Sequence, residues 1–247
     1  MLIFYIALGV LAVLFLAAVA LSAYLFRFAC RRDGRGNEDE NLERLKNSDL
    51  AHFAPIIAEG LNAFRAAEKE DVYITSRDGL KLHGYWFPHK DAKGTIVMVH
   101  GWRSRVAYDF SAIWRKYRDM GYNLLGVEQR ALGKSEGKYI CFGVKERFDL
   151  IDWVHFVNRR CGEHLPVIFS GISMGSSTVM FAIGNEELPK TSSARLPIAD
   201  SPRRTTNSVT CSARATTCPS FRFCISPTSL PRSFAASRLT NATPQTR

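Results

Sequence analysis

No histidine occurs beyond residue 164 of this 247-residue chain, and its six cysteines form no ligand or disulfide pattern. Zinc sites and disulfide-rich domains need cysteines at short, regular spacings. Cys30, Cys141 and Cys161 are far apart in the sequence, so we predict free thiols and no metal site. No metal or organic cofactor is implied, and free thiols are typical of a cytoplasmic setting.

The chain also lacks a basic stripe, despite its formal net charge of +10. From Thr191 onward it contains eight arginines, no lysine and a single acidic residue, Asp200. Residues 1–190 therefore carry a net charge of only +3 (25 basic minus 22 acidic). Nucleic-acid-binding domains gather basic and aromatic side chains on one surface, and the sequence shows no such motif. We predict that nucleic acid is not a partner.

Residues 1–26 lack any charged side chain and are almost wholly apolar. At about 1.5 Å per residue, a helix of this length exceeds the roughly 30 Å hydrocarbon core of a bilayer. Arg27, Arg31, Arg32 and Arg35 follow it, so the positive-inside rule places the C-terminal side in the cytoplasm. We predict a single-pass anchor in the cell membrane. The alternative is a cleaved signal peptide, whose basic n-region and shorter apolar core are lacking.

Residues 27–70 are predicted to connect this anchor to a folded domain. The stretch 31–47 is rich in charge and indicates a linker. After Ser48 and Asp49, which are residue types that cap helices, apolar residues recur at helical spacing: Leu50, Phe53, Ile57, Leu61 and Phe64. The polar face of this amphipathic helix is mixed in sign, which favours packing on the domain over binding to the bilayer surface.

Residues 71–190 alternate short apolar runs with amphipathic stretches. Apolar runs at 72–75 and 82–87 flank the turn signal Ser-Arg-Asp-Gly and predict a hairpin. Further runs predict buried strands at 95–99, 124–127 and 167–169. Helices are predicted from two sets of apolar residues at helical spacing: Phe110, Ile113, Trp114 and Tyr117, then Val144, Phe148, Ile151 and Val154. Such alternation predicts an α/β fold with a mainly parallel sheet and helices on both faces.

One strand-to-helix junction carries the pattern G-x-S-x-G, from Gly171 to Gly175. The strand before it and the helix-compatible run after it, 176–183, are the context that a nucleophile elbow requires. We expect the two glycines because side chains there would collide with neighbouring backbone, while Ser173 itself is strained. The hydroxyl would then stand clear of the sheet at a helix N-terminus, where developing negative charge is favoured. The alternative is an ordinary turn with a capping serine.

Three segments resemble the α/β-hydrolase superfamily in order and spacing: VMVHGW at 97–102, GYNLLGVEQRALGKSEG at 121–137 and FSGISMG at 169–175. The likeness is strongest to membrane-anchored bacterial serine aminopeptidase and esterase-like members, and it covers roughly residues 71–190. It implies Ser173 as the nucleophile, in an elbow bounded by Gly171 and Gly175. It also implies an oxyanion hole formed by the backbone N–H groups of Trp102 and Met174.

Two features depart from this resemblance. The segment 128–135 has Glu128 and Leu132 where the family's D-x-R-x-H-G-x-S form has Asp and His, which alters the local hydrogen bonding. More importantly, the family order is Ser, then Asp or Glu, then His, and no histidine follows Ser173. His100 is expected to be structural. A rearranged triad would have to use His83, His89 or His100.

The composition changes abruptly at Thr191. Residues 191–247 contain no Gly, Lys, Glu, His, Tyr, Trp or Met, and Ser, Thr, Arg, Pro and Ala dominate. One interpretation is a disordered tail, since this composition buries little apolar surface. The other is a shifted reading frame. Codons for TSSARLPIADSPRRTTNSV, read one base early, permit NVKRAVADCGFTSPYDEFS, which contains an apolar strand, a turn and an acidic helix start.

We therefore predict a membrane-tethered serine hydrolase of α/β-hydrolase type, truncated or frameshifted after residue 190. An intact relative would attack an ester, thioester or amide of a small-molecule or lipid-like acyl substrate through Ser173. Because the chain lacks the catalytic acid and histidine, we predict little or no turnover. The alternative is a non-catalytic, membrane-anchored binding or scaffold protein on a hydrolase-like fold.

Overall fold

The computed structural model describes residues 1–196, except 33 and 35, and residues 209–212. The helices are α1 (Leu2–Cys30), α2 (Glu38–Lys46), a 3-10 turn at Ala51–Phe53, α3 (Ala54–Ala66), α4 (Val106–Asp109), α5 (Trp114–Asp119), α6 (Glu146–Cys161) and α7 (Met174–Ile183). The strands are β1 (Glu70–Thr75), β2 (Lys81–Phe87), β3 (Thr95–Val99), β4 (Asn123–Val127), β5 (Val167–Gly171), β6 (Ser192–Leu196) and β7 (Val209–Ser212).

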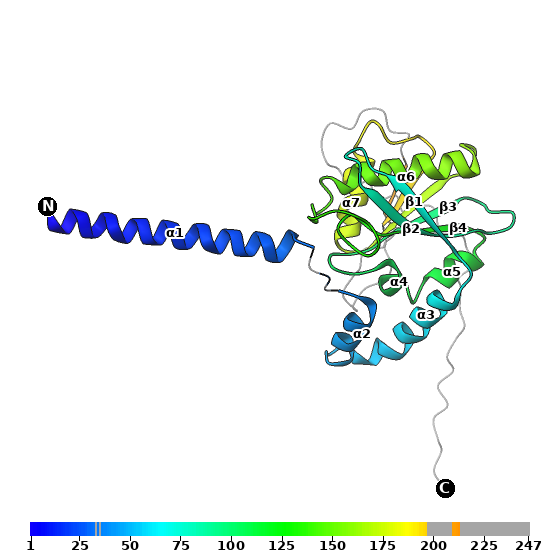
Figure 1. The fold of residues 1–247 in the computed structure, drawn as a ribbon. Coiled ribbons are helices and arrows are strands. Elements are labelled where there is room, and N and C mark those ends of the chain that lie inside the picture. The colour runs from blue at the N-terminus through cyan, green and yellow to red at the C-terminus, as the bar shows by residue number, and fades with distance from the viewer. Residues whose placement is uncertain (33, 35, 197–208, 213–247) are drawn as a thin grey trace, which may run out of the picture. The chain divides into compact units, whose positions relative to one another are not determined.

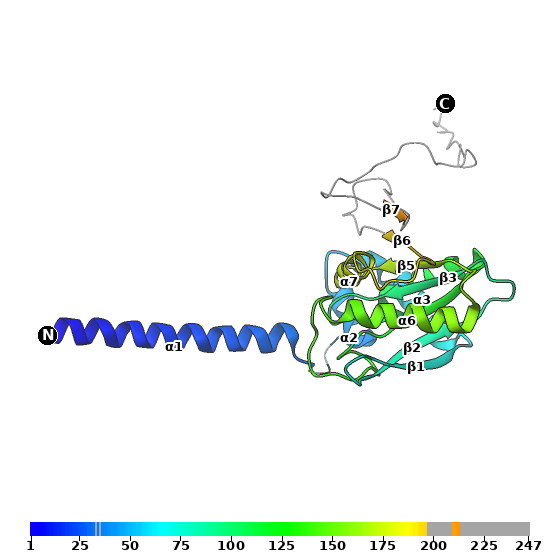
Figure 2. The same ribbon diagram turned by 90° about the horizontal axis from the view of Figure 1, so that it is seen from above.

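These strands form one mixed sheet in the order β1-β2-β4-β3-β5-β6-β7 (Figures 1 and 2). The central strands β4, β3, β5 and β6 are parallel to one another. β1 and β2 form an antiparallel hairpin, β2 pairs antiparallel with β4, and β7 pairs antiparallel with β6. The parallel arrangement brings the carboxyl ends of β3, β4 and β5 to the same edge of the sheet, where ligands bind in such folds.

Helices cover both faces of this sheet, which is visible along β3. Val97 and Val99 belong to a core with α6 and α7, whereas Ile96 and Met98 belong to a core with α3, α4 and α5. Alternate residues of a strand face opposite sides, so a strand buried on both sides has a continuous apolar sequence. Figure 2 shows α6 and α7 on one side of the sheet and α3 on the other. The predicted α/β fold class is confirmed.

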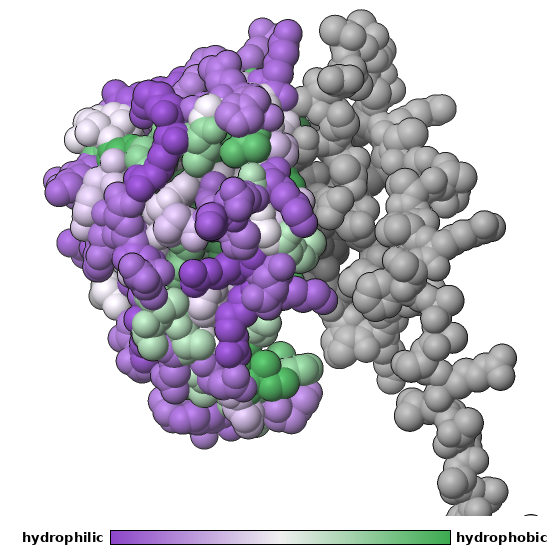
Figure 3. Space-filling view, turned by 90° about the vertical axis from the view of Figure 1, so that its right-hand side faces the viewer, coloured by the Kyte–Doolittle hydropathy of each residue, from purple (hydrophilic) through white to green (hydrophobic). Residues whose placement is uncertain are grey.

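The long apolar helix predicted at the N-terminus is also present. α1 spans 29 residues and contains an 18-residue window with a mean hydropathy of 2.9, and none of its residues is buried. Its length and composition satisfy the criteria for a membrane span, and an N-terminal signal sequence satisfies them too. The face of the domain seen in Figure 3 differs sharply from α1, since it is mostly hydrophilic with small, separate apolar patches.

The structure differs from the sequence prediction at several boundaries. The predicted linker at 31–47 contains helix α2, which Asn37 caps by accepting a hydrogen bond from the N–H of Glu40 at 2.8 Å. Part of the predicted tail lies in the sheet as β6 and β7. The remainder of that tail, residues 197–208 and 213–247, is outside the described residues.

Only part of the helix predicted around 110–117 is helical: residues 110–113 form a turn after α4, and α5 begins at Trp114. Gly60 of α3 packs against this turn, since a Cβ there would lie 2.1 Å from the carbonyl oxygen of Ser111. Trp114 completes the contact by donating from its indole nitrogen to the Gly60 oxygen at 3.2 Å. At residues 110–113, contacts with α3 therefore accompany the loss of the predicted helical pattern.

Val144, which was predicted to lie within the next helix, precedes α6 and is exposed.

Candidate active site

Ser173 connects the end of β5 to the start of α7 in a strained conformation. Its φ is 53° and its ψ is −118°, a combination that costs on the order of 1–3 kcal/mol for a non-glycine residue. The side chain is exposed, and it precedes the first N–H groups of α7. The strained turn thus presents the hydroxyl at the positive end of a helix.

The two glycines of the turn leave no room for side chains. A Cβ at Gly175 would lie 2.0 Å from the carbonyl oxygen of Val99, at the end of β3. A Cβ at Gly171 would lie 2.7 Å from the backbone oxygen of Gly175. The turn is further tightened by Ser176, whose hydroxyl donates to the Gly171 oxygen at 2.6 Å. The strand and the helix therefore approach each other closely at this turn.

The loop after β3 lies directly beside this serine. The N–H of Ile172 donates to the Val99 oxygen at 3.0 Å, and a Cβ at Gly101 would lie 3.4 Å from the Cβ of Ser173. Trp102 follows Gly101, and Met174 follows Ser173. In the described part of the chain, neither of these two backbone N–H groups has a hydrogen-bond acceptor. The N–H groups of Trp102 and Met174, which are predicted to form the oxyanion hole, are therefore both available to donate to a ligand.

Asp109 of α4 fixes the shape of that loop, a role that no sequence pattern indicated. One carboxylate oxygen accepts from the Gly101 N–H at 2.7 Å and the other from the Ser104 hydroxyl at 2.6 Å. Burial raises the pKa of Asp109, while these two hydrogen bonds act in the opposite direction. The loop also holds Arg103 at a φ of 49°. A half-buried carboxylate therefore holds the shape of the turn beside Ser173.

His100 is a structural residue in this site. Its Nδ1 lies 2.8 Å from the Gly101 oxygen, and its Nε2 accepts from the N–H of Gln129 at 3.1 Å. Burial lowers the pKa of His100 to about 4, so the ring is neutral at neutral pH. Gln129 also accepts from the hydroxyl of Thr178 at 2.9 Å. The histidine and glutamine together connect β3, β4 and α7 behind the serine.

No histidine within the described residues makes a hydrogen bond to Ser173. His83 is on β2, which β4 and β3 separate from β5, and it bonds to Asp71 at 2.5 Å. His89 follows β2, where its backbone N–H bonds to the side chain of Asn123 at the start of β4. The described contacts thus supply no rearranged triad.

The substituted segment at 128–135 makes its own hydrogen bonds. The side chain of Glu128 fills the space beside Gly133, where a Cβ would lie 1.2 Å from the Oε2 atom of Glu128. Arg105 is within ion-pair distance, with its Nε 3.8 Å from the Glu128 carboxylate. Burial raises the pKa of Glu128 to about 7. Ser135 closes the turn, since its hydroxyl donates to the Glu128 backbone oxygen at 2.6 Å and accepts from the N–H of His83 at 2.9 Å.

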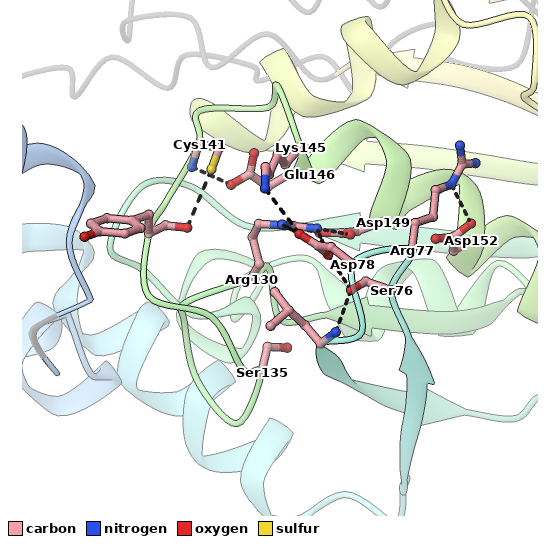
Figure 4. A network of polar contacts seen from close by, with 12 residues as sticks. Ser76, Arg77, Asp78, Arg130, Ser135, Cys141, Lys145, Glu146, Asp149 and Asp152 are labelled. Atoms are coloured by element: carbon pink, nitrogen blue, oxygen red, sulfur yellow. Dashed lines mark hydrogen bonds and ion pairs between the residues drawn. The ribbon is translucent and has the colours of Figure 1, made fainter.

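Arg130, at the carboxyl end of β4, holds three elements together (Figure 4). It forms two hydrogen bonds to Asp149 of α6, at 2.7 and 2.6 Å, and two to Asp78 of the β1–β2 turn, at 2.8 and 3.1 Å. These bonds hold the pKa of Asp78 well below its usual range. Lys145 adds a further contact to Asp78 at 3.3 Å. The Arg130–Asp149 pair is buried, whereas Asp78 and Lys145 are exposed, and the Arg130 guanidinium bonds to both carboxylates.

Within the described residues, no cluster of three or more His, Cys, Asp or Glu side chains is arranged to hold a metal ion. The site therefore consists of a strained serine, two backbone N–H groups and the buried polar groups that position them. Together with the sheet, it defines an α/β protein with a serine at the carboxyl edge of its central strands.

No protein-family model matches the chain. It is similar to YqkD of Bacillus subtilis, with 28% identity over 122 residues, covering 49% of this chain and 40% of that protein. It is also similar to YfhR of Salmonella typhimurium, with 27% identity over 126 residues, covering 48% and 42%. Both are described as uncharacterized. The chain thus spans less than half the length of these curated relatives.

Among solved structures, the esterase Pf2001 of Pyrococcus furiosus is similar at 30% identity, with a TM-score of 0.45, covering 49% of this chain and 48% of that one. An α/β hydrolase from Novosphingobium aromaticivorans is similar at 24% identity, with a TM-score of 0.38, covering 53% and 44%.

Proposed function

We propose that this chain is a membrane-tethered serine hydrolase of α/β-hydrolase type, or the N-terminal part of one. The observation that carries the proposal is Ser173, strained at φ 53° between β5 and α7 and flanked by two glycines that exclude side chains. A structural turn needs no such strain, whereas an exposed nucleophile at a helix N-terminus benefits from it.

The chemistry would be acyl transfer from an ester, thioester or amide. The Ser173 oxygen would attack the carbonyl carbon, and the N–H groups of Trp102 and Met174 would stabilise the oxyanion of the tetrahedral intermediate. As the leaving group departs with the serine proton, an acyl-enzyme remains for water to hydrolyse. That proton transfer needs a general base. No histidine follows Ser173 in the sequence, so we expect little or no turnover from this chain.

A fluorophosphonate probe tests the nucleophile without requiring turnover. The oxyanion hole and binding alone retain roughly 10³–10⁴-fold catalysis over water when a triad member is lost, so slow labelling at Ser173 is expected. Ser173→Ala should abolish that labelling, and Ser177→Ala, on the same helix, should leave it unchanged. Equal labelling of the wild type and Ser173→Ala would show that Ser173 is not an activated nucleophile in this chain. An inactive hydrolase fragment and the non-catalytic binding or scaffold protein would then both remain, and a confirmed reading frame would favour the scaffold.

The absence of the acid and histidine is explained by our second proposal, a frame change near codon 190. The support is the abrupt loss of Gly, Lys, Glu and His after Lys190, together with the apolar strand that the other frame permits. Sequencing the gene and its transcript across codon 190 tests this. An indel followed by a frame encoding Asp and His supports it, whereas early stop codons in that frame refute it.

A further inference from the structure

The last turn of α1 contacts the loop that carries the proposed oxyanion hole. The indole nitrogen of Trp102 donates to the carbonyl oxygen of Ala29 at 2.9 Å, and the guanidinium of Arg103 donates to that of Phe28. The Phe28 ring also lies against the Trp102 ring, with centroids 6.2 Å apart. The loop beside Ser173 is therefore attached to the end of the apolar helix.

A second loop holds the same segment from the other side. The N–H of Ile140 donates to the Cys30 oxygen at 2.6 Å, and the N–H of Arg32 donates to the Lys138 oxygen at 2.9 Å. The Arg32 guanidinium donates to the backbone oxygens of Ser135 at 2.6 Å and Gly133 at 2.9 Å. Backbone pairing of this kind fixes the exit of α1 against the domain rather than leaving it on a free linker.

The position of these contacts along α1 sets the distance to a bilayer. Arg27 is the first charged residue of the helix, and it precedes Ala29 by two residues. Two helical residues span only about 3 Å, so the Trp102 contact would lie at the level of the lipid head groups. Ser173 is next to this loop, since a Cβ at Gly101 would lie 3.4 Å from its own Cβ.

A cavity of about 740 Å³ opens between α1 and the second loop. Its apolar lining comes from the helix (Phe26), from the β1–β2 turn (Leu80) and from the loop (Tyr139, Ile140 and Phe142). Charged side chains of both signs also line it: Asp78, Arg130, Glu136, Lys138 and Lys145. The long lysine side chains are amphipathic and suit a head-group boundary. One residue of the cavity wall, Ile140, shares a small buried cluster with Met174, which follows Ser173 in the elbow. Its volume is in the range of ligand pockets.

We propose that the face carrying Ser173 is held against the bilayer and that the substrate is an acyl ester or thioester of a membrane-resident amphiphile. Its acyl chain would lie in the cavity between Phe26 and Phe142, and its carbonyl would reach Ser173 at head-group depth. This inference rests on the proposed hydrolase and on α1 as a membrane span. A soluble small-molecule ester would require neither the apolar cavity wall from α1 nor the fixed exit of that helix.

The tryptophans provide a direct test, because Trp102 is 36% exposed whereas Trp86, Trp114 and Trp153 are buried. The chain is reconstituted into phosphatidylcholine vesicles whose acyl chains are brominated near the head group, and flotation of the vesicles in a density gradient shows whether the chain is bound to them. Bromine should reduce the tryptophan fluorescence of the wild type. The Trp102→Phe variant should lack the part of the fluorescence that bromine quenches. Iodide in the aqueous phase should have little effect on that part.

Two further variants separate the cavity from the rest of the surface. In the Trp102→Phe background, Phe142→Trp should again be quenched by the brominated lipid. Met120→Trp is the matched control, since Met120 is exposed and lies at the amino end of the parallel strands. It should be quenched by iodide and not by bromine.

The outcomes separate this inference from the proposals on which it rests. In one outcome the chain floats with the vesicles, but iodide and not bromine quenches Trp102 and the indole introduced by Phe142→Trp. That result would overturn the membrane-facing site while supporting α1 as a membrane anchor. A chain that fails to float overturns the anchor and this inference together. Neither result depends on catalysis, so fluorophosphonate labelling of Ser173 remains an independent measure of the nucleophile.

Discussion

At Gly175 the polypeptide has no room for a single methyl group. The carbonyl of Val99 occupies that space, and the first turn of α7 packs directly on the end of β3. The same close approach forces Ser173 into its positive φ, because the chain must turn from strand to helix within two residues. The strain at Ser173 and the need for glycine at Gly171 and Gly175 therefore have the same cause, the close approach of α7 to the end of the sheet.

Gly175→Ala should destabilise the protein by about 3 kcal/mol, since overpacking of a rigid backbone contact costs this order of free energy. Gly184→Ala is the control. Its nearest neighbour is 3.7 Å away and its φ is −73°, so the change should be within about 0.5 kcal/mol. Urea denaturation in detergent, followed by circular dichroism, measures both. Similar midpoints for the two variants would show that the elbow is not tightly packed.

Glu128 should make stability depend on pH. Its pKa is raised to about 7 in the fold from 4.5, so the folded state holds the proton more tightly. The stability contributed by the protonated side chain is complete below about pH 4.5 and is lost as pH rises towards 7. By linkage, the loss amounts to about 3 kcal/mol.

Glu128→Gln should remove this dependence, because the amide does not titrate. The difference in unfolding free energy between the variant and the wild type should grow from pH 4.5 to 7 and then level off. Denaturation midpoints measured across this range test it. Parallel pH profiles for the two proteins would mean that Glu128 is ionised in the fold.

At the scale of elements, Arg130 determines how the hairpin, β4 and α6 fit together. Its side chain is only 6% exposed, and its partner Asp149 is 7% exposed. Breaking a buried pair leaves an uncompensated charge and typically costs 3–5 kcal/mol. The Arg130–Asp149 pair lies beside the site, so its loss should also loosen the loops around the cavity.

Arg130→Met should therefore lower the unfolding free energy by about 3–5 kcal/mol. Arg77→Ala is the matched control. Arg77 also pairs with two carboxylates, Asp152 and Glu187, but it is 42% exposed, so its loss should cost no more than about 1 kcal/mol. The double variant Arg130→Met/Asp149→Leu should recover part of the loss. Equal effects of Arg130→Met and Arg77→Ala on the urea midpoint would contradict this account.

At the scale of the whole molecule, the structure joins an apolar helix to an α/β domain through hydrogen bonds at residues 28–32 rather than through a free tether. The first 26 residues carry no charged side chain, and Arg27, Arg31, Arg32 and Arg35 follow them, with one acidic residue, Asp33, among these arginines. By the positive-inside rule, we predict that the C-terminal side of this helix lies in the cytoplasm.

A topology experiment tests this orientation. Expressed in a bacterium, the chain should resist extraction from membranes by alkaline carbonate. Protease added to spheroplasts should leave the domain intact, whereas protease added to inverted membrane vesicles should digest it. Release of a shorter chain that has lost its first two dozen or so residues would instead identify a cleaved signal peptide.

The sequence by itself determined the sheet class and the strands up to residue 171, and it predicted a nucleophile elbow at Ser173. Apolar runs such as 95–99 and 124–127 form buried strands wherever both faces of a sheet are covered, and G-x-S-x-G between a strand and a helix leaves few conformations for its serine. These are local patterns, in which neighbouring residues carry the information. The order of its motifs also predicts that the backbone N–H groups of Trp102 and Met174 serve Ser173 as an oxyanion hole, which stays a prediction.

Only the tertiary structure decided the contacts between segments remote in sequence. Asp109 bonding to the Gly101 N–H, the raised pKa of Glu128 against Gly133, and the break between α4 and α5 opposite Gly60 have no periodic signature. The same holds for the hydrogen bond from the Trp102 indole to the Ala29 oxygen, which joins residues 73 positions apart in the chain. This bond fixes the end of α1 at the edge of the sheet where Ser173 lies. Each depends on which surfaces meet once the sheet has formed, because a hydrogen bond across the fold depends on distance in space and not on spacing in the chain.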